Sequence, residues 1–287
     1  EVSEMIMKLL SKNAEDRNLS GQGLTRDLKL CNNQYETYGR IEPFALAEED
    51  YPEKLRISQK IYGRDREIQL LMEIFKKTSL GSIHMAVISG NPGVGKTSLV
   101  QEIYKPITRE KGYFIVGKFD PFYRNVPYSA LVLAFAELVK QLLAESEENL
   151  RHWKVRLLSA MGVYGQIIID VIPDMELVIG SQPPVKKVDA AEAQNRFNRV
   201  MMDFVRVFCA PEHPLVIFLD DLQWVDTATL KLIEGVMTDG KIQHLFLILS
   251  YRDNEVTADH PLFETLKTLE QENCDFSRIH LNPLNQT

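Results

Sequence analysis

The sequence is poor in cysteine and has no long apolar run. Its three cysteines, Cys31, Cys209 and Cys274, are odd in number and far apart, which excludes a disulfide-rich secreted fold and the paired spacing of a zinc site. We therefore expect a reducing, cytoplasmic setting. No apolar stretch reaches the roughly 20 residues of a membrane-spanning helix, and no signal peptide is recognisable. The sequence predicts no membrane partner.

The chain also lacks an excess of positive charge. It has 33 Lys and Arg residues against 40 Asp and Glu residues, a net charge of −7. Because a general nucleic-acid binder needs a basic surface to neutralise phosphates, we expect no nucleic-acid partner. The composition, 45% hydrophobic and 25% charged in 287 residues, is that of a globular protein with one large domain. Since the chain starts at Glu1, without Met and within a helical pattern, we expect a fragment of a longer protein.

One strong motif is present, GNPGVGKT at residues 90–97. It fits G-x-x-x-x-G-K-[ST] at every fixed position, follows an apolar run at 85–88 and precedes a predicted helix. Its glycines let backbone N–H groups converge on a phosphate, and the helix N-terminus favours the same charge. Lys96 should reach the β- and γ-phosphates, and Thr97 should bind Mg²⁺. The alternative, a plain Gly/Pro turn, does not explain the full motif. The predicted binding residues are Gly90, Asn91, Pro92, Gly93, Val94, Gly95, Lys96, Thr97 and Ser98.

A second motif is PLVIFLDD at residues 214–221, five apolar residues followed by two acids. The run predicts a buried parallel strand, and ligands of open α/β sheets bind beyond the carboxyl ends of such strands. Asp220 is the predicted Mg²⁺ ligand, directly or through water, and Asp221 the predicted group that orients the attacking water. Successive strand residues point to opposite sides, so the two acids can have different roles. A simple turn after a strand is the alternative.

Hydrophobic periodicity places further elements around these motifs. We expect strands at 113–119, 245–250 and 278–281, and helices at 97–110, 129–143, 190–205 and 227–235. Asp189 and Asp226 are predicted helix caps. The apolar segment 162–180 is compatible with strand or helix, and Pro173 interrupts either.

The motifs together resemble those of AAA-like and STAND-type ATPases. IYGRDRE at 61–67, about 30 residues before the phosphate loop, is similar to the hhGRE element of that family, and FLDDLQWVD at 218–226 to its extended Walker B motif. The resemblance implies that Ile61, Tyr62 and Arg64 lie near adenine. It also implies that Arg252, which follows the strand at 245–250, senses the γ-phosphate. A guanidinium suits that role because it is permanently charged. No GTPase-type N/T-K-x-D motif follows the second motif, which favours ATP.

The N-terminal segment resembles a different family. MKLLSKNAEDR at 7–17 and GLTRDLKLC at 23–31 are similar to the last two helices of a protein-kinase domain, where the counterpart of Arg17 pairs with a Glu of the activation segment. That partner segment, the Gly-rich loop, HRD and DFG are all absent, so this chain has no kinase active site. A helical extension packed on the main domain is the alternative.

The order of these segments resembles that of cyanobacterial-type multi-sensor signalling kinases. The resemblance implies kinase helices at 1–38, a linker at 39–57 and a P-loop NTPase core at 58–287, with the family's helical lid outside this chain. The implied fold is a three-layer α/β domain of the ASCE type, with parallel strands in the order 5-1-4-3-2 and a short all-helical N-terminal extension.

The implied function is a regulatory switch that binds Mg²⁺ and ATP or ADP and hydrolyses ATP slowly, inside a Ser/Thr kinase that also carries sensor and histidine-kinase modules. Its partners would be other domains of that kinase, with nucleotide-dependent self-association also open. Two alternatives stay open: a nucleotide-binding structural module without turnover, and a scaffold that docks a kinase domain.

Overall fold

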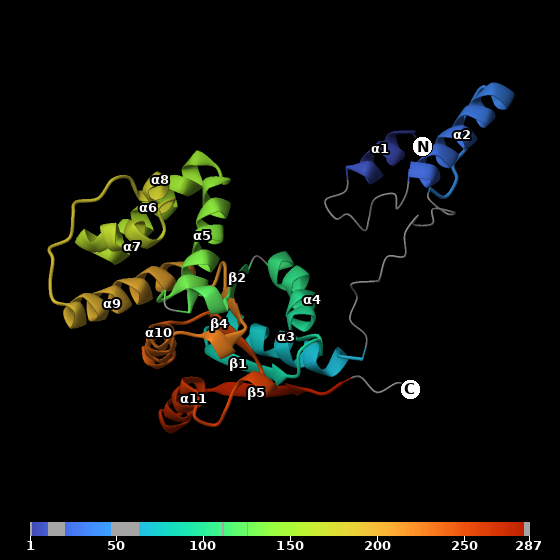
Figure 1. The fold of residues 1–287 in the computed structure, drawn as a ribbon. Helices are drawn as coiled ribbons and strands as arrows, with labels where there is room; N and C mark the ends of the chain where they lie inside the picture. Colours follow the sequence, from blue (N-terminus) through green and yellow to red (C-terminus); the bar gives the residue numbers. More distant parts are fainter. Residues whose placement is uncertain (1, 11–20, 47–62, 111, 125, 284–287) are drawn as a thin grey trace. The chain divides into compact units, whose positions relative to one another are not determined.

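The computed structural model describes residues 2–10, 21–46, 63–110, 112–124 and 126–283. The chain divides into two units, residues 1–59 and 60–287, and each is described by itself (Figure 1). Arg17, Ile61 and Tyr62 lie outside the described residues. None of the helices in the described ranges is both long and apolar enough to cross a lipid bilayer.

The first unit contains two helices, α1 (Val2–Leu9) and α2 (Gly21–Tyr38). Met5 and Cys31 are its buried apolar side chains among the described residues. Most of its other large apolar side chains are exposed: Val2, Ile6, Met7, Leu9, Leu10, Leu28, Leu30, Tyr35 and Tyr38. Two short helices of this kind bury too little apolar surface to form a domain core.

The second unit is built on a five-stranded sheet whose strands all run parallel. The strands are β1 (Ile83–Gly90), β2 (Tyr113–Lys118), β3 (Leu215–Asp220), β4 (Leu245–Arg252) and β5 (Phe276–Leu281). Their order is β2-β3-β4-β1-β5, which confirms the predicted order. Strand β4 lies between the two strands that carry the motifs.

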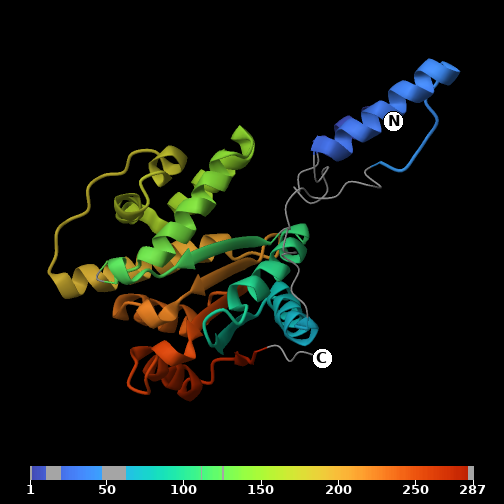
Figure 2. The same ribbon diagram turned by 45° about the vertical axis from the view of Figure 1, so that its right-hand side comes forward.

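Helices cover both faces of the sheet (Figures 1 and 2). On one face are α3 (Asp65–Ser79) and α4 (Lys96–Arg109). On the other are α5 (Ser129–Leu143), α9 (Ala190–Phe208), α10 (Thr227–Thr238) and α11 (Pro261–Gln271). Strand β1 supplies alternate residues to the two cores, Ala86 and Ile88 to the first and Met85 and Val87 to the second. A strand covered on both faces needs a continuous apolar run, which is what the sequence has there.

Three further helices form an insertion between α5 and α9: α6 (Glu147–Met161), α7 (Gly165–Val171) and α8 (Met175–Ile179). The ambiguous segment at 162–180 is therefore helical, and its helices are separated at Pro173. Short 3-10 turns complete the unit: η2 (Pro121–Tyr123), η3 (Gly162–Tyr164), η4 (Leu222–Trp224) and η5 (Asp253–Glu255). The predicted caps are present, since Asp189 accepts from Glu192 N and Asp226 from Thr229 N.

Candidate nucleotide-binding site

The phosphate loop connects β1 to α4 in the conformation that its glycines permit. Gly93 and Gly95 have φ angles of 77° and 96°, in the left-handed region that side chains disfavour. Gly90 has a φ of 151°, and a Cβ there would lie 2.7 Å from the carbonyl oxygen of Leu281. Gly95 is the N-cap residue, and α4 begins at Lys96, one residue earlier than predicted. The loop therefore directs the free N–H groups of a helix N-terminus beyond the carboxyl edge of the sheet.

Lys96 folds back over this loop and is only 8% exposed. Its Nζ donates to the carbonyl oxygens of Gly90 at 2.7 Å and Asn91 at 3.0 Å. Burial lowers the pKa of this ammonium, while the nearby Asp220 carboxylate opposes that shift. The ammonium is thus held at the mouth of the loop, where the predicted phosphate site lies.

Asp220 ends strand β3 and joins three elements. Its Oδ2 accepts a hydrogen bond from Thr97 Oγ1 at 2.8 Å, and its Oδ1 accepts from Asp221 N at 3.0 Å. Its Oδ1 also accepts from the hydroxyl of Ser250, the buried residue of β4 beside it. The Thr97 hydroxyl and the Asp220 carboxylate place hard oxygen atoms side by side, and oxygen is the ligand that Mg²⁺ prefers. The residues present therefore fit a magnesium ion.

Among the described residues, no cluster of metal-ligating side chains competes with the Thr97–Asp220 pair. In the part of the chain that the structure describes, no group of three or more His, Cys, Asp or Glu side chains is placed to hold a metal ion. A Mg²⁺ site with one or two protein ligands is normal where phosphate oxygens and waters supply the rest. The Thr97–Asp220 oxygen pair is therefore compatible with a Mg²⁺ ion whose other ligands are phosphate oxygens and waters.

Asp221 lies just beyond β3 and leaves the strand conformation. Its φ of 60° is left-handed, so the side chain turns away from the direction that strand alternation predicts. Its Oδ1 accepts from Gln223 Nε2 at 2.9 Å and from Arg252 Nε at 3.1 Å. The two acids do have different surroundings, as expected, but a turn rather than the strand pleat separates them.

A second cation, Lys118, reaches Asp221 from the end of β2. Its Nζ lies 3.3 Å from Asp221 Oδ2. Burial acts to raise the pKa of Asp221, but the hydrogen bond from Gln223 and the charges of Arg252 and Lys118 outweigh it and hold the pKa below its usual value. The carboxylate therefore stays ionised near neutral pH. The sequence analysis missed Lys118, although a lysine at the carboxyl end of a predicted strand was a visible signal.

Arg252 is at the site because β4 pairs with β1, so that Arg252 lies opposite Gly90. Besides its contact with Asp221, its Nη1 donates to Glu255 Oε1 at 2.9 Å. This bond to Glu255, with the charge of Asp221, raises the pKa of the guanidinium. The backbone N–H of Arg252 also donates to Gln223 Oε1 at 3.3 Å. Gln223 thus links both sides of the Asp221–Arg252 pair; it belongs to the FLDDLQWVD segment at 218–226, but the sequence analysis assigned it no role.

Arg64 lies on another side of the phosphate loop. It is 5% exposed, and its Nη2 donates to the carbonyl oxygens of Val94, at 3.4 Å, and Asn282. It therefore ties the loop to the chain that follows β5. Its Nε has no hydrogen-bond partner among the described residues. Ile61 and Tyr62, its companions in the expected base-binding element, are not described.

Comparison with known proteins shows which protein family the chain resembles. A family model described as "AAA ATPase domain" matches residues 60–248. The chain is 34% identical over 256 residues to "Hybrid signal transduction histidine kinase G" of Dictyostelium discoideum, and 23% identical over 301 residues to "Histidine protein kinase 1" of Candida albicans. These matches take in 82% and 91% of this chain but only 7% and 12% of the two relatives. The chain therefore spans a small part of the relatives it matches.

Among solved structures, Cdc6p from Pyrobaculum aerophilum is similar with a TM-score of 0.45 and 11% identity, over 82% of this chain and 48% of that one. The Orc1 protein of Aeropyrum pernix, solved in complex with DNA, has a TM-score of 0.42 and 12% identity, over 79% and 47%. The family match covers strands β1 to β3, the first half of β4 and the phosphate loop. On that match, together with the parallel sheet and the geometry of the loop, the chain belongs to the AAA ATPase domain family.

Proposed function

We propose that residues 60–287 form a regulatory switch that binds Mg²⁺·ATP and hydrolyses it slowly within a signalling kinase. The observation that carries this proposal is the convergence of Lys96, Thr97, Asp220, Asp221 and Arg252. They come from the start of α4 after the phosphate loop, from the end of β3 with the residue after it, and from β4, and contacts of 2.7–3.1 Å link them to each other and to the loop. These are the residue types that phosphoryl transfer to water requires.

The roles follow from the chemistry of each side chain. Thr97 and Asp220 would hold the metal, which when bound supplies positive charge to the phosphate oxygens. Lys96, which contacts the loop, and Arg252, which lies opposite Gly90, are cationic donors and would stabilise charge that develops on the transferred group. Asp221 would accept a hydrogen bond from the attacking water and so orient it.

Asp221 can take this role despite its three partners. Its Oδ1 already accepts from Gln223 and Arg252, whereas its Oδ2 has Lys118 as its partner. Each carboxylate oxygen can accept about two hydrogen bonds, so Oδ2 retains a position for a water. The depressed pKa makes Asp221 a weak base. These features support positioning of the water rather than strong proton abstraction, and hence slow turnover.

A nucleotide-binding structural module is the second candidate. Intramolecular partners on Lys96, Asp221 and Arg252 favour it, because substrate binding would have to compete with each of these contacts. The two candidates agree on binding and differ on hydrolysis.

The experiment compares the wild type with Lys96→Ala and Asp221→Asn. Asn tolerates the left-handed backbone of residue 221, so this variant should fold. We expect ATP with Mg²⁺ to raise the melting temperature of the wild type and of Asp221→Asn, but not of Lys96→Ala. Hydrolysis should be measurable in the wild type and lost in Asp221→Asn. Equal, negligible hydrolysis in both would favour the structural module, and an unchanged wild-type melting temperature would contradict both candidates.

For the nucleotide base, we infer a pocket bordered by residues 61–64. The buried position of Arg64 against Val94 supports this, because it places the N-cap residue of α3 beside the phosphate loop. ATP rather than GTP is expected, and competition between the two in the thermal-shift assay tests this. On the net charge of −7 we also expect no nucleic-acid binding.

For the context, we propose a STAND-type module preceded by the end of a Ser/Thr kinase domain at 1–38 and a linker at 39–57. The names of the relatives support a signalling kinase, since both are histidine kinases. The exposed apolar side chains of α1 and α2 support the idea that these helices pack in a larger domain. A scaffold role predicts that a Lys96→Ala chain still captures a purified kinase domain, and failure to do so would favour the switch.

A further inference from the structure

A hollow of about 700 Å³ lies at the end of the sheet opposite the nucleotide site. Tyr113, the first residue of β2, forms part of its wall, together with residues of α6 and of the turn before β3. At the other end of β2, Lys118 pairs with Asp220. Five residues of strand span about 17 Å, so the hollow is separate from the phosphate loop. We call it the β2–α6 hollow.

Three rings form one wall of the β2–α6 hollow. The ring centroids of Tyr113 and Trp153 both lie 5.1 Å from that of His213, and 6.1 Å from each other. Trp153 is buried and anchored in the second core, so the wall is held by packing. The volume of the β2–α6 hollow is in the range of small-molecule sites. The wall is therefore a preformed aromatic surface rather than a gap between mobile side chains.

Hydrogen bonds fix this wall further. His213 Nδ1 lies 3.0 Å from the carbonyl oxygen of Phe208, so Nδ1 is the donor and Nε2 accepts from Arg156 Nη1 at 3.3 Å. Burial lowers the pKa of His213, which keeps the imidazole neutral at pH 7. Arg156 also donates to the carbonyl oxygen of Val207 and lies 4.9 Å from the Trp153 ring centroid. The charge of Arg156 is thus committed to the protein.

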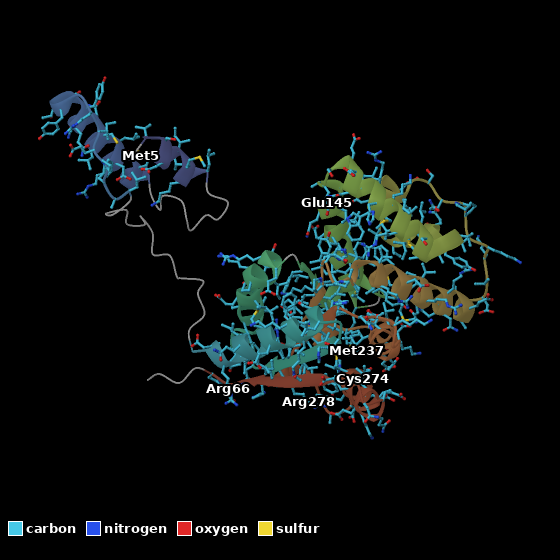
Figure 3. The ribbon with its side chains drawn as sticks, turned by 180° about the vertical axis from the view of Figure 1, so that it is seen from behind. Met5, Arg66, Glu145, Met237, Cys274 and Arg278 are labelled. Atoms are coloured by element: carbon cyan, nitrogen blue, oxygen red, sulfur yellow. The ribbon has the colours of Figure 1, made fainter. Side chains whose placement is uncertain are left out.

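Two carboxylates border the same hollow, Glu145 just after α5 and Glu212 in the turn before β3; Glu145 is labelled in Figure 3. Glu145 accepts a hydrogen bond from the Tyr113 hydroxyl at 3.3 Å. Burial and the nearby Glu145 carboxylate raise the pKa of Tyr113, so its hydroxyl stays protonated and remains a donor. Neither carboxylate forms an ion pair with any cation of the described chain. With Arg156 as the one permanent cation lining the hollow, negative charge is in excess.

We propose that the β2–α6 hollow binds an organic cation, an ammonium or guanidinium carried on a flat or aliphatic body. Tyr113 adds a further aromatic ring that can attract a cation, since Arg156 already lies over the Trp153 ring, and the two unpaired carboxylates can accept charge-assisted hydrogen bonds. An anion is disfavoured because it would meet two carboxylates and one committed guanidinium. A free amine and the Lys or Arg side chain of a protein offer the same chemistry.

The test uses Trp153 as the reporter. The chain has two tryptophans, so the Trp224→Phe background leaves Trp153 alone in the hollow. The probes are benzylamine and a terminally blocked Ala-Lys-Ala peptide, with benzyl alcohol and the norleucine peptide as neutral controls. We expect a saturable change of Trp153 emission with a cationic probe and none with its neutral match. Tighter binding of benzylamine would indicate a free amine, and tighter binding of the peptide a protein side chain.

Charge variants make the test specific. Glu145→Gln and Glu212→Gln should each weaken binding of the cationic probe by up to about fivefold, the range of partly exposed charge pairs. Glu272→Gln, an exposed carboxylate after α11, should leave it unchanged. The Gln side chains keep the shape of Glu, and equal melting temperatures would show that the variants fold. Absence of saturable binding, equal binding of the neutral probes, or binding that survives both variants at full strength would overturn the proposal.

Discussion

The Nζ of Lys118 lies 3.3 Å from Oδ2 of Asp221, across the carboxyl ends of two hydrogen-bonded strands. The carboxylate proposed to orient the attacking water is thus held by one cation from β2 and by another, Arg252, from β4. The two pairs differ in exposure, since the side chain of Lys118 is 65% exposed and that of Arg252 is 34% exposed. Water competes more strongly for the first pair, so Lys118 is the partner that can leave at least cost.

Removal of the Lys118 charge should speed hydrolysis modestly. In Lys118→Gln the Oδ2 of Asp221 loses a competitor for the attacking water. A pair this exposed contributes at most about 1 kcal/mol, so the single-turnover rate should rise by no more than about fivefold, with unchanged ATP affinity. Lys140→Gln, which removes an exposed pair with Glu137, is the control. A tenfold fall in rate would contradict this view and indicate that Lys118 acts on the phosphate.

The ionised Asp221 should stabilise the fold in a pH-dependent way. Because its pKa is lower in the folded chain than in the unfolded chain, its contribution is present above the unfolded value of about 3.9 and is lost as the pH falls through the folded value. The difference in unfolding free energy between the wild type and Asp221→Asn should therefore be constant from pH 5 to 8 and shrink below about pH 4. Chemical denaturation at each pH measures it. A difference that changed between pH 6 and 8 would assign the titration to another group.

Loss of the Ser250 hydroxyl should weaken magnesium binding. Ser250 donates to Asp220 Oδ1 and so fixes the carboxylate that also contacts Thr97. Loss of such an outer contact typically costs about 10–100-fold in metal affinity. In Ser250→Ala, ATP affinity measured by calorimetry should fall with Mg²⁺ and stay near the wild-type value with EDTA. An equal fall in both conditions would show that the hydroxyl supports the loop rather than the metal site.

Asp226 should contribute to stability as a helix cap. Its carboxylate accepts from the N–H and the hydroxyl of Thr229 and from the N–H of Tyr128, whose φ is 62°. Replacement of such a cap by Ala costs about 1–2 kcal/mol, which for a domain of this size lowers the melting temperature by roughly 2–8 °C. Asp226→Asn keeps a capping oxygen and should recover most of the loss. Thermal unfolding of both variants distinguishes the cap from the charge.

Gly117 should tolerate no side chain. A Cβ there would lie 2.4 Å from the carbonyl oxygen of Ala130, because α5 packs directly on β2 at this point. Gly117→Ala should destabilise the domain by about 1–3 kcal/mol or more, since backbone rather than a flexible side chain must move. Val116→Ala, at a half-exposed position next to it, should change stability by less than about 1 kcal/mol. Urea denaturation compares the two, and a neutral Gly117→Ala would contradict the packing of α5 described above.

Much of the site follows from local sequence. The phosphate loop is a contiguous motif, in which the local backbone conformation requires the glycines and the Lys-Thr pair follows them directly. The two acids likewise follow directly on an apolar run. The sheet order was predictable by resemblance, and the structure has it. By contrast, Ser250 and Lys118 reach the carboxylates through side-chain contacts between strands far apart in the chain. Although Lys118 stands at the end of a predicted strand, its contact with Asp221 and that of Ser250 with Asp220 depend on which strands are neighbours and in what register.

The insertion of helices α6 to α8 is a second case in which local sequence left the structure undecided. The apolar segment at 162–180 carries no clear period, so strand and helix were equally compatible with it until the packing against α5, α6 and α9 was known. Tyr113 and Trp153 have ordinary positions in a strand and a helix. Their contact with His213 exists because the turn before β3 returns to the start of β2.

The amino-acid sequence alone was enough to predict a phosphate loop, a strand that ends in two acids, and a parallel α/β sheet. These depend on glycine conformation, apolar runs and helix termini, all of which act over a few residues. The register of β1, β3 and β4 placed Arg252 beside Gly90 and Ser250 beside Asp220, and the left-handed turn at Asp221 chose its partners. Strand register depends on the packing of both sheet faces at once, so it becomes definite only when the whole domain is assembled.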